Sequence, residues 1–426
     1  MNPAAEDPAH RLAEHLFRHE SAKMVAILTG IYGARNLELA EDVVQDALAR
    51  ALAAWPFGIP ENPSAWLLRT AKNLAIDRLR REKNFQGKQP EIIAEMESRI
   101  AGQAGPDGGS EVTDDLLRMM FVCCHPGLPP EAQSALALKA LCGFSPAEIA
   151  RAFLISEAAV SKRLVRARQR IRDERIPFEI PAGGELPPRL DGVLKILYLL
   201  FNEGHKASHG EAIIRADLCH EAIRLALLLA AHPAGDRPPT HALIAMMAFT
   251  AARLRARTDH EGHLVRLEDQ DRALWNQDLI GMGVRHLGRS SGGEELSEYH
   301  LQAGIAACHT LASSAATTDW PRILTLYDQL LVRNPSPVVA LNRAVAISKV
   351  HGPEAAISSL ETAQLRERLG NYHLLHAVLG ELEFSRGKPG AAADHFRRAI
   401  DLTGNVPERA LLAEQLNKCG SHESSR

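Results

Sequence analysis

Four polar side chains recur at every fourth position in the stretch AWLLRTAKNLAIDRLRREK, residues 65–83. They are Arg69, Asn73, Asp77 and Arg81, and residues spaced in this way lie on one face of a helix. The opposite face of the same predicted helix carries apolar residues at helical spacing: Trp66, Leu67, Ala71, Leu74, Ala75 and Leu79. A helix that buries one flank and offers guanidinium and amide donors on the other is suited to holding a nucleic-acid backbone, although a solvated surface helix has the same pattern.

The residues before this helix predict a second helix with an acidic start. Residues 40–55 begin AEDVVQD and keep helical apolar spacing up to Trp55. The stretch PFGIPENP, residues 56–63, is predicted to be a loop because its prolines and glycine interrupt the helical pattern. Phe57 in this loop fits both a platform for an unstacked base and a small hydrophobic anchor.

A helix-turn-helix is predicted between residues 145 and 172. Ser145 begins a short helix, a break follows near Leu154, and Ser156 has the residue type of an N-cap for a second helix. Between residues 161 and 172 the second helix bears six basic residues and no acid. Because such a run repels itself without an anionic partner, we expect it to bind DNA. Leu154 stands where such turns usually have glycine, which leaves the angle between the two helices open.

Length and composition set limits on these motifs. The 426 residues, with a formal net charge of −3, are enough for about two to four domains. Helical patterns prevail and period-two alternation is nearly absent, which predicts an all-α fold. The six cysteines form no CxxC pair, and the first residues lack the apolar core of a signal peptide, so we expect a reduced, cytoplasmic protein without a membrane span.

In combination, these motifs resemble the extracytoplasmic-function (ECF) group of bacterial RNA polymerase sigma factors, in the sigma-70 family. By this resemblance residues 1–88 form a region 2 domain for polymerase docking and recognition of the promoter minus-ten element. Residues 89–112 form an acidic Gly/Pro linker, and residues 113–178 form a region 4 helix-turn-helix domain for the minus-thirty-five element. The implied partners are core RNA polymerase and promoter DNA, the implied role is promoter recognition, DNA melting and transcription initiation, and no cofactor is expected.

The resemblance also implies roles for individual residues. The candidates for polymerase binding are Asp42, Gln45 and Asp46. The candidates for the minus-ten element are Phe57, Arg69, Asn73, Arg78 and Arg81. The candidates for the minus-thirty-five element are Ser161, Lys162, Arg163, Arg166, Arg168 and Arg170. Base contacts are expected from the beginning of that helix and phosphate contacts from its later arginines.

Residues 179–426 extend beyond an ordinary ECF sigma factor. Gly352 and Gly387 lie 35 residues apart, which is a tetratricopeptide period. The small and aromatic positions where paired helices would cross are Gly380, Gly387, Ala392, Phe396 and Ala399. We predict a helical-hairpin, tetratricopeptide-like domain whose concave surface binds a protein or peptide. This arrangement resembles the sigma-factor subgroup in which such an extension is thought to regulate the sigma factor, by inhibition or by activation.

Two alternatives fit parts of the sequence. A DNA-tethered helical scaffold or transcription regulator without sigma activity would need the helix-turn-helix but not the acidic helix, the loop and the basic face before it. A metal enzyme would draw its ligands from one crowded segment: Glu203, His205, His209, Glu211, His220 and Glu221. That segment lacks HExxH spacing, and the chain lacks nucleotide-loop and hydrolase motifs. We therefore expect no metal site and no enzymatic activity.

Overall fold

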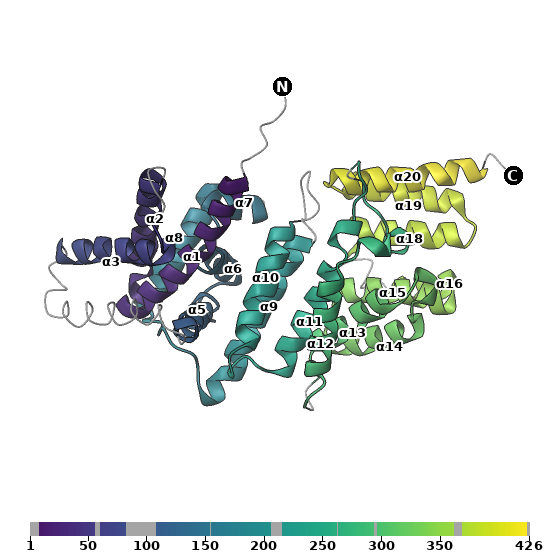
Figure 1. Cartoon of the computed structure of the whole chain (residues 1–426). Helices are drawn as coiled ribbons and strands as arrows, with labels where there is room; N and C mark the ends of the chain where they lie inside the picture. The colour runs from purple at the N-terminus through teal and green to yellow at the C-terminus, as the bar shows by residue number, and fades with distance from the viewer. Residues whose placement is uncertain are drawn as a thin grey trace, which may run out of the picture. The chain divides into compact units, whose positions relative to one another are not determined.

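The computed structural model describes residues 8–55, 60–81, 108–153, 155–205, 215–261, 263–293, 296–361 and 369–423. Within these ranges the chain is built from helices, and the extended pairing there is one isolated bridge between Thr258 and Leu264. The predicted all-α fold is confirmed (Figure 1). The chain divides into two compact units, residues 1–199 and 200–426.

The first unit contains two groups of helices. The first group consists of α1 (Pro8–Tyr32), the 3-10 helix η1 (Ala34–Asn36), α2 (Leu37–Ala54) and α3 (Pro63–Arg81). The second group consists of α5 (Gly108–Cys123), α6 (Pro130–Cys142), α7 (Pro146–Phe153) and α8 (Glu157–Asp173), after which η4 (Gly183–Glu185) leads into α9 (Leu186–His205). Helix α1 packs on α2 and α3 within its own group and on α5 and α6 of the other. The two groups therefore pack against one another in one compact unit.

Apolar spacing decides which faces of these helices are buried. In α2 the buried apolar residues are Leu37, Ala40, Val43, Val44, Ala47 and Ala51, which form one stripe of a helix. Helix α6 ends at Gly143, whose φ of 68° is the left-handed conformation that glycine adopts without steric cost. The N–H of Phe144 then donates to the carbonyl of Leu138 at 3.0 Å. This cap turns the chain toward α7 and positions the helix-turn-helix.

The first half of the second unit is arranged around a central helix. Its elements are α10 (Ala216–Ala230), α11 (Pro238–Ala251), η5 (Leu254–Ala256), η6 (Leu267–Asp269), η7 (Arg272–Leu274), α12 (Gln277–Ser290) and α13 (Glu298–Leu311). Helix α11 packs against α10, α12 and α13, and its side chains from Thr240 to Phe249 are buried. A helix that is apolar all round is typical of a position inside a core.

The second half of this unit consists of stacked antiparallel helices. After the short 3-10 helix η8 (Ala315–Thr317), they are α14 (Trp320–Arg333), α15 (Pro337–His351), α16 (Pro353–Leu360), α18 (His373–Ser385), α19 (Pro389–Leu402) and α20 (Val406–Glu423). Figure 1 shows α18, α19 and α20 side by side at the C-terminal end. A Cβ added to Gly380 would lie 2.7 Å from the ring of Phe396. The predicted crossing of small and aromatic residues is therefore present, and Gly352 and Gly387 have φ values of 88° and 78° at the turns.

Candidate nucleic-acid interface

The three predicted polymerase-binding residues share the exposed face of α2. Asp42, Gln45 and Asp46 are exposed, whereas the apolar stripe of the same helix is buried. The guanidinium of Arg78, on α3, binds both carboxylates: Nη1 lies 3.0 Å from Asp42 Oδ2 and Nη2 lies 2.7 Å from Asp46 Oδ2. One residue predicted to touch DNA is thus held by two residues predicted to touch polymerase.

Helix α3 carries its polar row on the surface, as its spacing predicts. Arg69, Asn73 and Asp77 are exposed, while Leu67, Leu68, Ala71 and Ala75 are buried against the rest of the group. At the start of the helix, Asn62 Oδ1 accepts the N–H of Ala65 at 3.0 Å, which is an N-cap contact. Arg81 closes α3, but its side chain lies outside the described residues, as do residues 56–59 of the loop, which include Phe57.

The helix-turn-helix forms from α7 and α8, and each helix begins with a capping contact. The N–H of Glu148 donates to Ser145 Oγ at 3.2 Å, and the N–H of Ser145 donates to Glu148 Oε2 at 2.7 Å, which is a capping box. Ser156 Oγ accepts the N–H of Ala159 at 3.2 Å, so the predicted N-cap is confirmed. Leu154 lies outside the described residues.

The basic residues of α8 differ in what surrounds them. The buried residues of this helix are Val160, Leu164, Ala167 and Ile171. Ser161, Lys162 and Arg166 are exposed and Arg163 is half-buried. Arg170 is exposed and pairs with Glu174, with its Nε 2.6 Å from Glu174 Oε1. The first two turns of α8 therefore offer a hydroxyl, an ammonium and a guanidinium that could meet base edges and phosphates.

Arg168 has a different environment from its neighbours. Its side chain is 17% exposed, and its Nη2 lies 2.5 Å from Oε2 of Glu41, on α2, which is 5% exposed. Burial raises the pKa of the Glu41 carboxyl, and the charges of Arg168 and Lys139 oppose that shift. Among the described residues, neither oxygen of Glu41 accepts a hydrogen bond of good geometry. Helices α2 and α8 thus meet through a buried ion pair.

Sequence reasoning missed Glu41 as a contact residue. The available signal was its position, because Glu41 falls four residues after Leu37 and three before Val44, on the apolar stripe of α2. A carboxylate at such a position needs a partner when the helix packs. The sequence gives no indication that the partner is in α8, since that depends on how the two groups of helices pack.

The segment considered for metal binding does not converge on a site in the described part of the chain. No three His, Cys, Asp or Glu side chains of the described residues are arranged to hold a metal ion. Glu221 instead pairs with Arg224 at 2.8 Å, and His209 and Glu211 lie outside the described residues.

Cys123 and Cys124, which are neighbours in the sequence, are both buried. Burial raises the pKa of the Cys124 thiol to about 12, which disfavours the reactive thiolate.

Among the described residues, no helix combines the length and the apolar character needed to cross a membrane.

Comparison with known families matches three parts of the chain. Residues 16–85 match sigma-70 region 2, residues 118–171 match sigma-70 region 4, and residues 189–291 match a family of unknown function, DUF6596. The first two matches contain the acidic helix, the basic helix and the helix-turn-helix. The third covers α10, α11 and α12 in the second unit.

Two relatives are similar to this chain over different lengths. An uncharacterized protein, R00370, of Rhizobium meliloti (strain 1021) is 42% identical over 386 residues, which cover 90% of each chain. The ECF RNA polymerase sigma factor SigM of Mycobacterium tuberculosis is 31% identical over 161 residues, which cover 37% of this chain and 74% of SigM. No solved structure matches.

Proposed function

This chain belongs to the ECF group of the sigma-70 family and has a C-terminal extension, and from this membership we propose that it binds core RNA polymerase in the cytoplasm and directs transcription initiation at promoters. The observation that carries the proposal is the order of its parts: an exposed acidic face on α2, a basic face on α3 and a basic helix-turn-helix. A DNA-tethered scaffold would need only the last of these.

We propose that α2 is the polymerase-docking element. Asp42, Gln45 and Asp46 are exposed together, and carboxylates give an interface charge complementarity with a basic partner. The side chains that form the ion pairs of Asp42 and Asp46 with Arg78 are 36–54% exposed. A basic partner can therefore replace Arg78 at little cost in free energy.

For the minus-ten element, the proposed contacts lie on α3. Arg69 and Asn73 are exposed on one face, with four-residue spacing, and such donors hold a single strand through its phosphates. Arg81 and Phe57 are proposed on their sequence positions. Arg78 becomes available to DNA when polymerase takes over its two carboxylate partners.

For the minus-thirty-five element, the proposed readers are the exposed residues at the beginning of α8. Ser161, Lys162 and Arg166 lie on the side away from the buried stripe, with Arg163 at its border, and the N-terminal half of a recognition helix is the part that meets base edges. Arg170 is proposed as a phosphate contact. Arg168 can reach phosphate only when α8 separates from Glu41 on α2.

We further propose that the second unit regulates these activities by binding a protein or peptide partner. Its stacked helix pairs resemble repeats that expose a concave surface. The match to DUF6596 assigns no function to this part of the chain.

The experiment that tests the docking proposal measures binding of the full chain to core polymerase without DNA. Asp42→Asn with Asp46→Asn should weaken binding about tenfold or more, because charge-assisted contacts are lost. Arg78→Gln is the matched control, since it breaks the same two intramolecular ion pairs and keeps both carboxylates. Equal affinity of wild type and the double Asn variant would overturn the docking assignment.

The sigma proposal as a whole is tested by run-off transcription with core polymerase and DNA from upstream of the gene. The full chain should start RNA at a defined position, and Lys162→Met with Arg166→Met should abolish that start. If the chain binds polymerase but starts no RNA on any DNA from upstream of its own gene, a DNA-tethered regulator without sigma activity would be favoured instead.

A further inference from the structure

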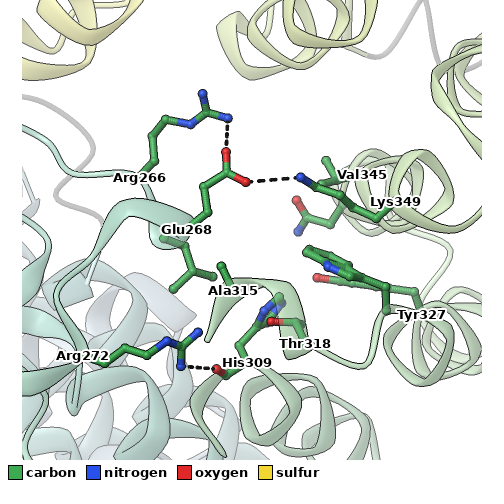
Figure 2. A pocket seen from close by; sticks show the side chains of 12 residues that line it. Arg266, Glu268, Arg272, His309, Ala315, Thr318, Tyr327, Val345 and Lys349 are labelled. Atoms are coloured by element: carbon green, nitrogen blue, oxygen red, sulfur yellow. Dashed lines mark hydrogen bonds and ion pairs between the residues drawn. The ribbon is translucent and has the colours of Figure 1, made fainter. Parts of the chain in front are cut away.

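A cavity of about 330 Å³ in the second unit has no role in the function proposed above. It lies between the segment 266–272 and residues from α13, α14 and α15 (Figure 2). A neighbouring cavity of about 660 Å³ shares Arg266, Glu268, Val345 and Lys349 with it. These four side chains therefore divide one groove into two chambers.

Positive charge exceeds negative charge in the smaller chamber. Arg266, Arg272 and Lys349 line it, and Glu268 is the carboxylate among its lining residues. Glu268 lies 2.6 Å from Arg266 Nη2 through one oxygen and 3.2 Å from Lys349 Nζ through the other, as Figure 2 shows. His309 adds no charge near neutral pH, because burial and the nearby arginines lower its pKa to about 4.

Arg272 is fixed in place without using all its donors. Its Nη1 donates to the carbonyls of His309, at 3.2 Å, and Ala312, at 2.7 Å. Its guanidinium lies 4.4 Å from the centre of the Trp275 ring. No carboxylate of the described residues lies within ion-pair distance of Arg272, and its Nε and Nη2 take no part in these two bonds. A guanidinium held in this way is preorganised to bind an oxyanion.

Much of the remaining wall of the chamber is apolar or aromatic. Leu267, Val345, Trp320 and Tyr327 supply apolar and aromatic surface to its lining, beside the polar side chains of Thr318 and Asn342. The ring of Trp320 is fixed by an edge contact with His309, with centroids 5.2 Å apart. The volume is at the low end of the range for small-molecule sites, so the chamber suits a ligand of about one ring rather than a folded partner.

We propose that this chamber binds a small organic anion, an apolar ring that carries a carboxylate or a phosphate. The oxyanion lies at Arg272, with Lys349 as a second cation, and the ring lies against Trp320 and Tyr327. Glu268 competes with the ligand because it holds Lys349 and adds negative charge to the chamber. The second unit thereby gains a site for a metabolite, independent of any polymerase contact.

The test is titration calorimetry on the full chain, with benzoate and phenyl phosphate as probes. Benzamide, the neutral isostere of benzoate, is the matched control ligand. We expect saturable binding of at least one anion, with one site per chain, and no binding of benzamide. Equal heats from benzoate and benzamide, or no saturable binding of either anion, would overturn the proposal.

Variants locate the site. Arg272→Met should weaken anion binding about tenfold or more, which is the usual loss for a charge-assisted bond. Lys349→Met should weaken it severalfold, and Glu268→Gln should tighten it. Arg397→Met, on the exposed surface of α19, should leave affinity unchanged. Lys349→Met and Glu268→Gln also decide the matter if Arg272→Met fails to fold, and unchanged affinity in both would refute the site.

One further arm separates a free metabolite from a chain terminus. A tripeptide that ends in phenylalanine presents the same ring and carboxylate, and tighter binding of this peptide than of both small anions would overturn the metabolite class. Because no polymerase or DNA is present, failure here leaves the sigma proposal untouched, and failure of transcription leaves the anion site untouched.

Discussion

The carboxylate of Glu41 is buried at the junction of α2 and α8, beside a single guanidinium. Its ion-pair partner is Arg168, with 2.5 Å between the charged atoms, and within the described part of the chain neither carboxylate oxygen has a well-aligned hydrogen bond. Taking two charges out of water is costly, and imperfect geometry recovers only part of that cost. The pair therefore specifies how α2 and α8 meet more than it stabilises the meeting.

Replacement of one partner should be far more harmful than replacement of both. Arg168→Met removes the ion-pair partner of the buried Glu41 carboxylate and leaves the weaker influence of Lys139, and should lower the free energy of unfolding by up to about 3–5 kcal/mol. The double variant with Glu41→Gln should recover most of that loss. Urea unfolding of the wild type, both single variants and the double variant measures the coupling. Arg166→Met, two residues away and exposed, is the control. If the losses of Arg168→Met and Glu41→Gln simply add in the double variant, Glu41 and Arg168 do not interact directly.

At the scale of residues, the sequence predicted local contacts and missed a distant one. The N-cap at Ser156 follows from residue type and from neighbours within one turn. The exposure of Asp42 and Asp46 follows from the helical period of α2. The Glu41–Arg168 pair joins residues far apart in the chain, and nothing in the local pattern selects Arg168 over Arg166 or Arg170.

At the scale of elements, the crossing of α18 and α19 depends on the absence of a side chain at Gly380. Gly380→Ala would place a methyl group 2.7 Å from the ring of Phe396, and such overpacking should lower the free energy of unfolding by about 1–3 kcal/mol. Gly420→Ala in α20 is a matched control, because nothing lies within 4 Å of its added Cβ. The control should be neutral or stabilising. A thermal melt in which both variants behave alike would show that the helices do not cross at Gly380.

The helices α11 and α12 are joined by a chain of titratable side chains. His241, on α11, lies 2.7 Å from Asp236 through Nε2 and 2.9 Å from His286, on α12, through Nδ1. Burial and neighbouring charges lower the pKa of His286 to about 4. Because the unfolded chain binds this proton at higher pH than the folded chain, the stabilising contribution is present above about pH 6.5 and is lost as the pH falls toward 4.

This linkage gives a prediction about stability and pH. The urea concentration at the unfolding midpoint of the wild type should decrease when the pH is lowered from about 7 to about 5. His286→Gln should make this decrease smaller, because the variant removes one group whose pKa differs between the folded and the unfolded chain. His232→Gln, in the turn that follows α10, is a comparison variant. The same pH dependence in the wild type and in His286→Gln would show that other groups are responsible.

Elements with a clear period were predicted well from the sequence. The basic helix expected over residues 65–83 is α3, and the repeat spacing in the last part of the chain marks the hairpins α15–α16 and α18–α19. Between residues 190 and 314 the sequence continues in helical patterns, but the repeat spacing is not clear there. The central helix of this stretch, α11, is buried on nearly every side, so it has no polar face from which a helical period can be recognised.

At the scale of the whole molecule, the first compact unit runs to Leu199, whereas the fourth predicted segment begins at residue 179. Arg189, at the start of α9, donates from Nη2 to the carbonyl of Phe121 in α5 at 2.8 Å, and its guanidinium lies over the Phe121 ring. The predicted boundary follows from the resemblance, because an ordinary ECF sigma factor ends after the helix-turn-helix, and from the prolines and glycines that come next. Only the packing shows that the following helix begins as part of the same unit.

The regulatory role of the second unit is best tested by a cut that respects this packing. A chain stopped after Arg175 loses the buried Ile176 and the Arg189 contact, and its unfolding free energy should be lower by about 2 kcal/mol or more than that of a chain stopped after Leu199.

If the extension regulates, the 1–199 form and the full chain should differ severalfold in run-off transcription with the same core polymerase. Higher output from 1–199 means that the extension inhibits, and lower output means that it activates. Equal output would contradict regulation in cis. Because 1–175 is expected to be unstable, its silence would show a folding defect, so the 1–199 form is the one that separates loss of regulation from loss of the fold.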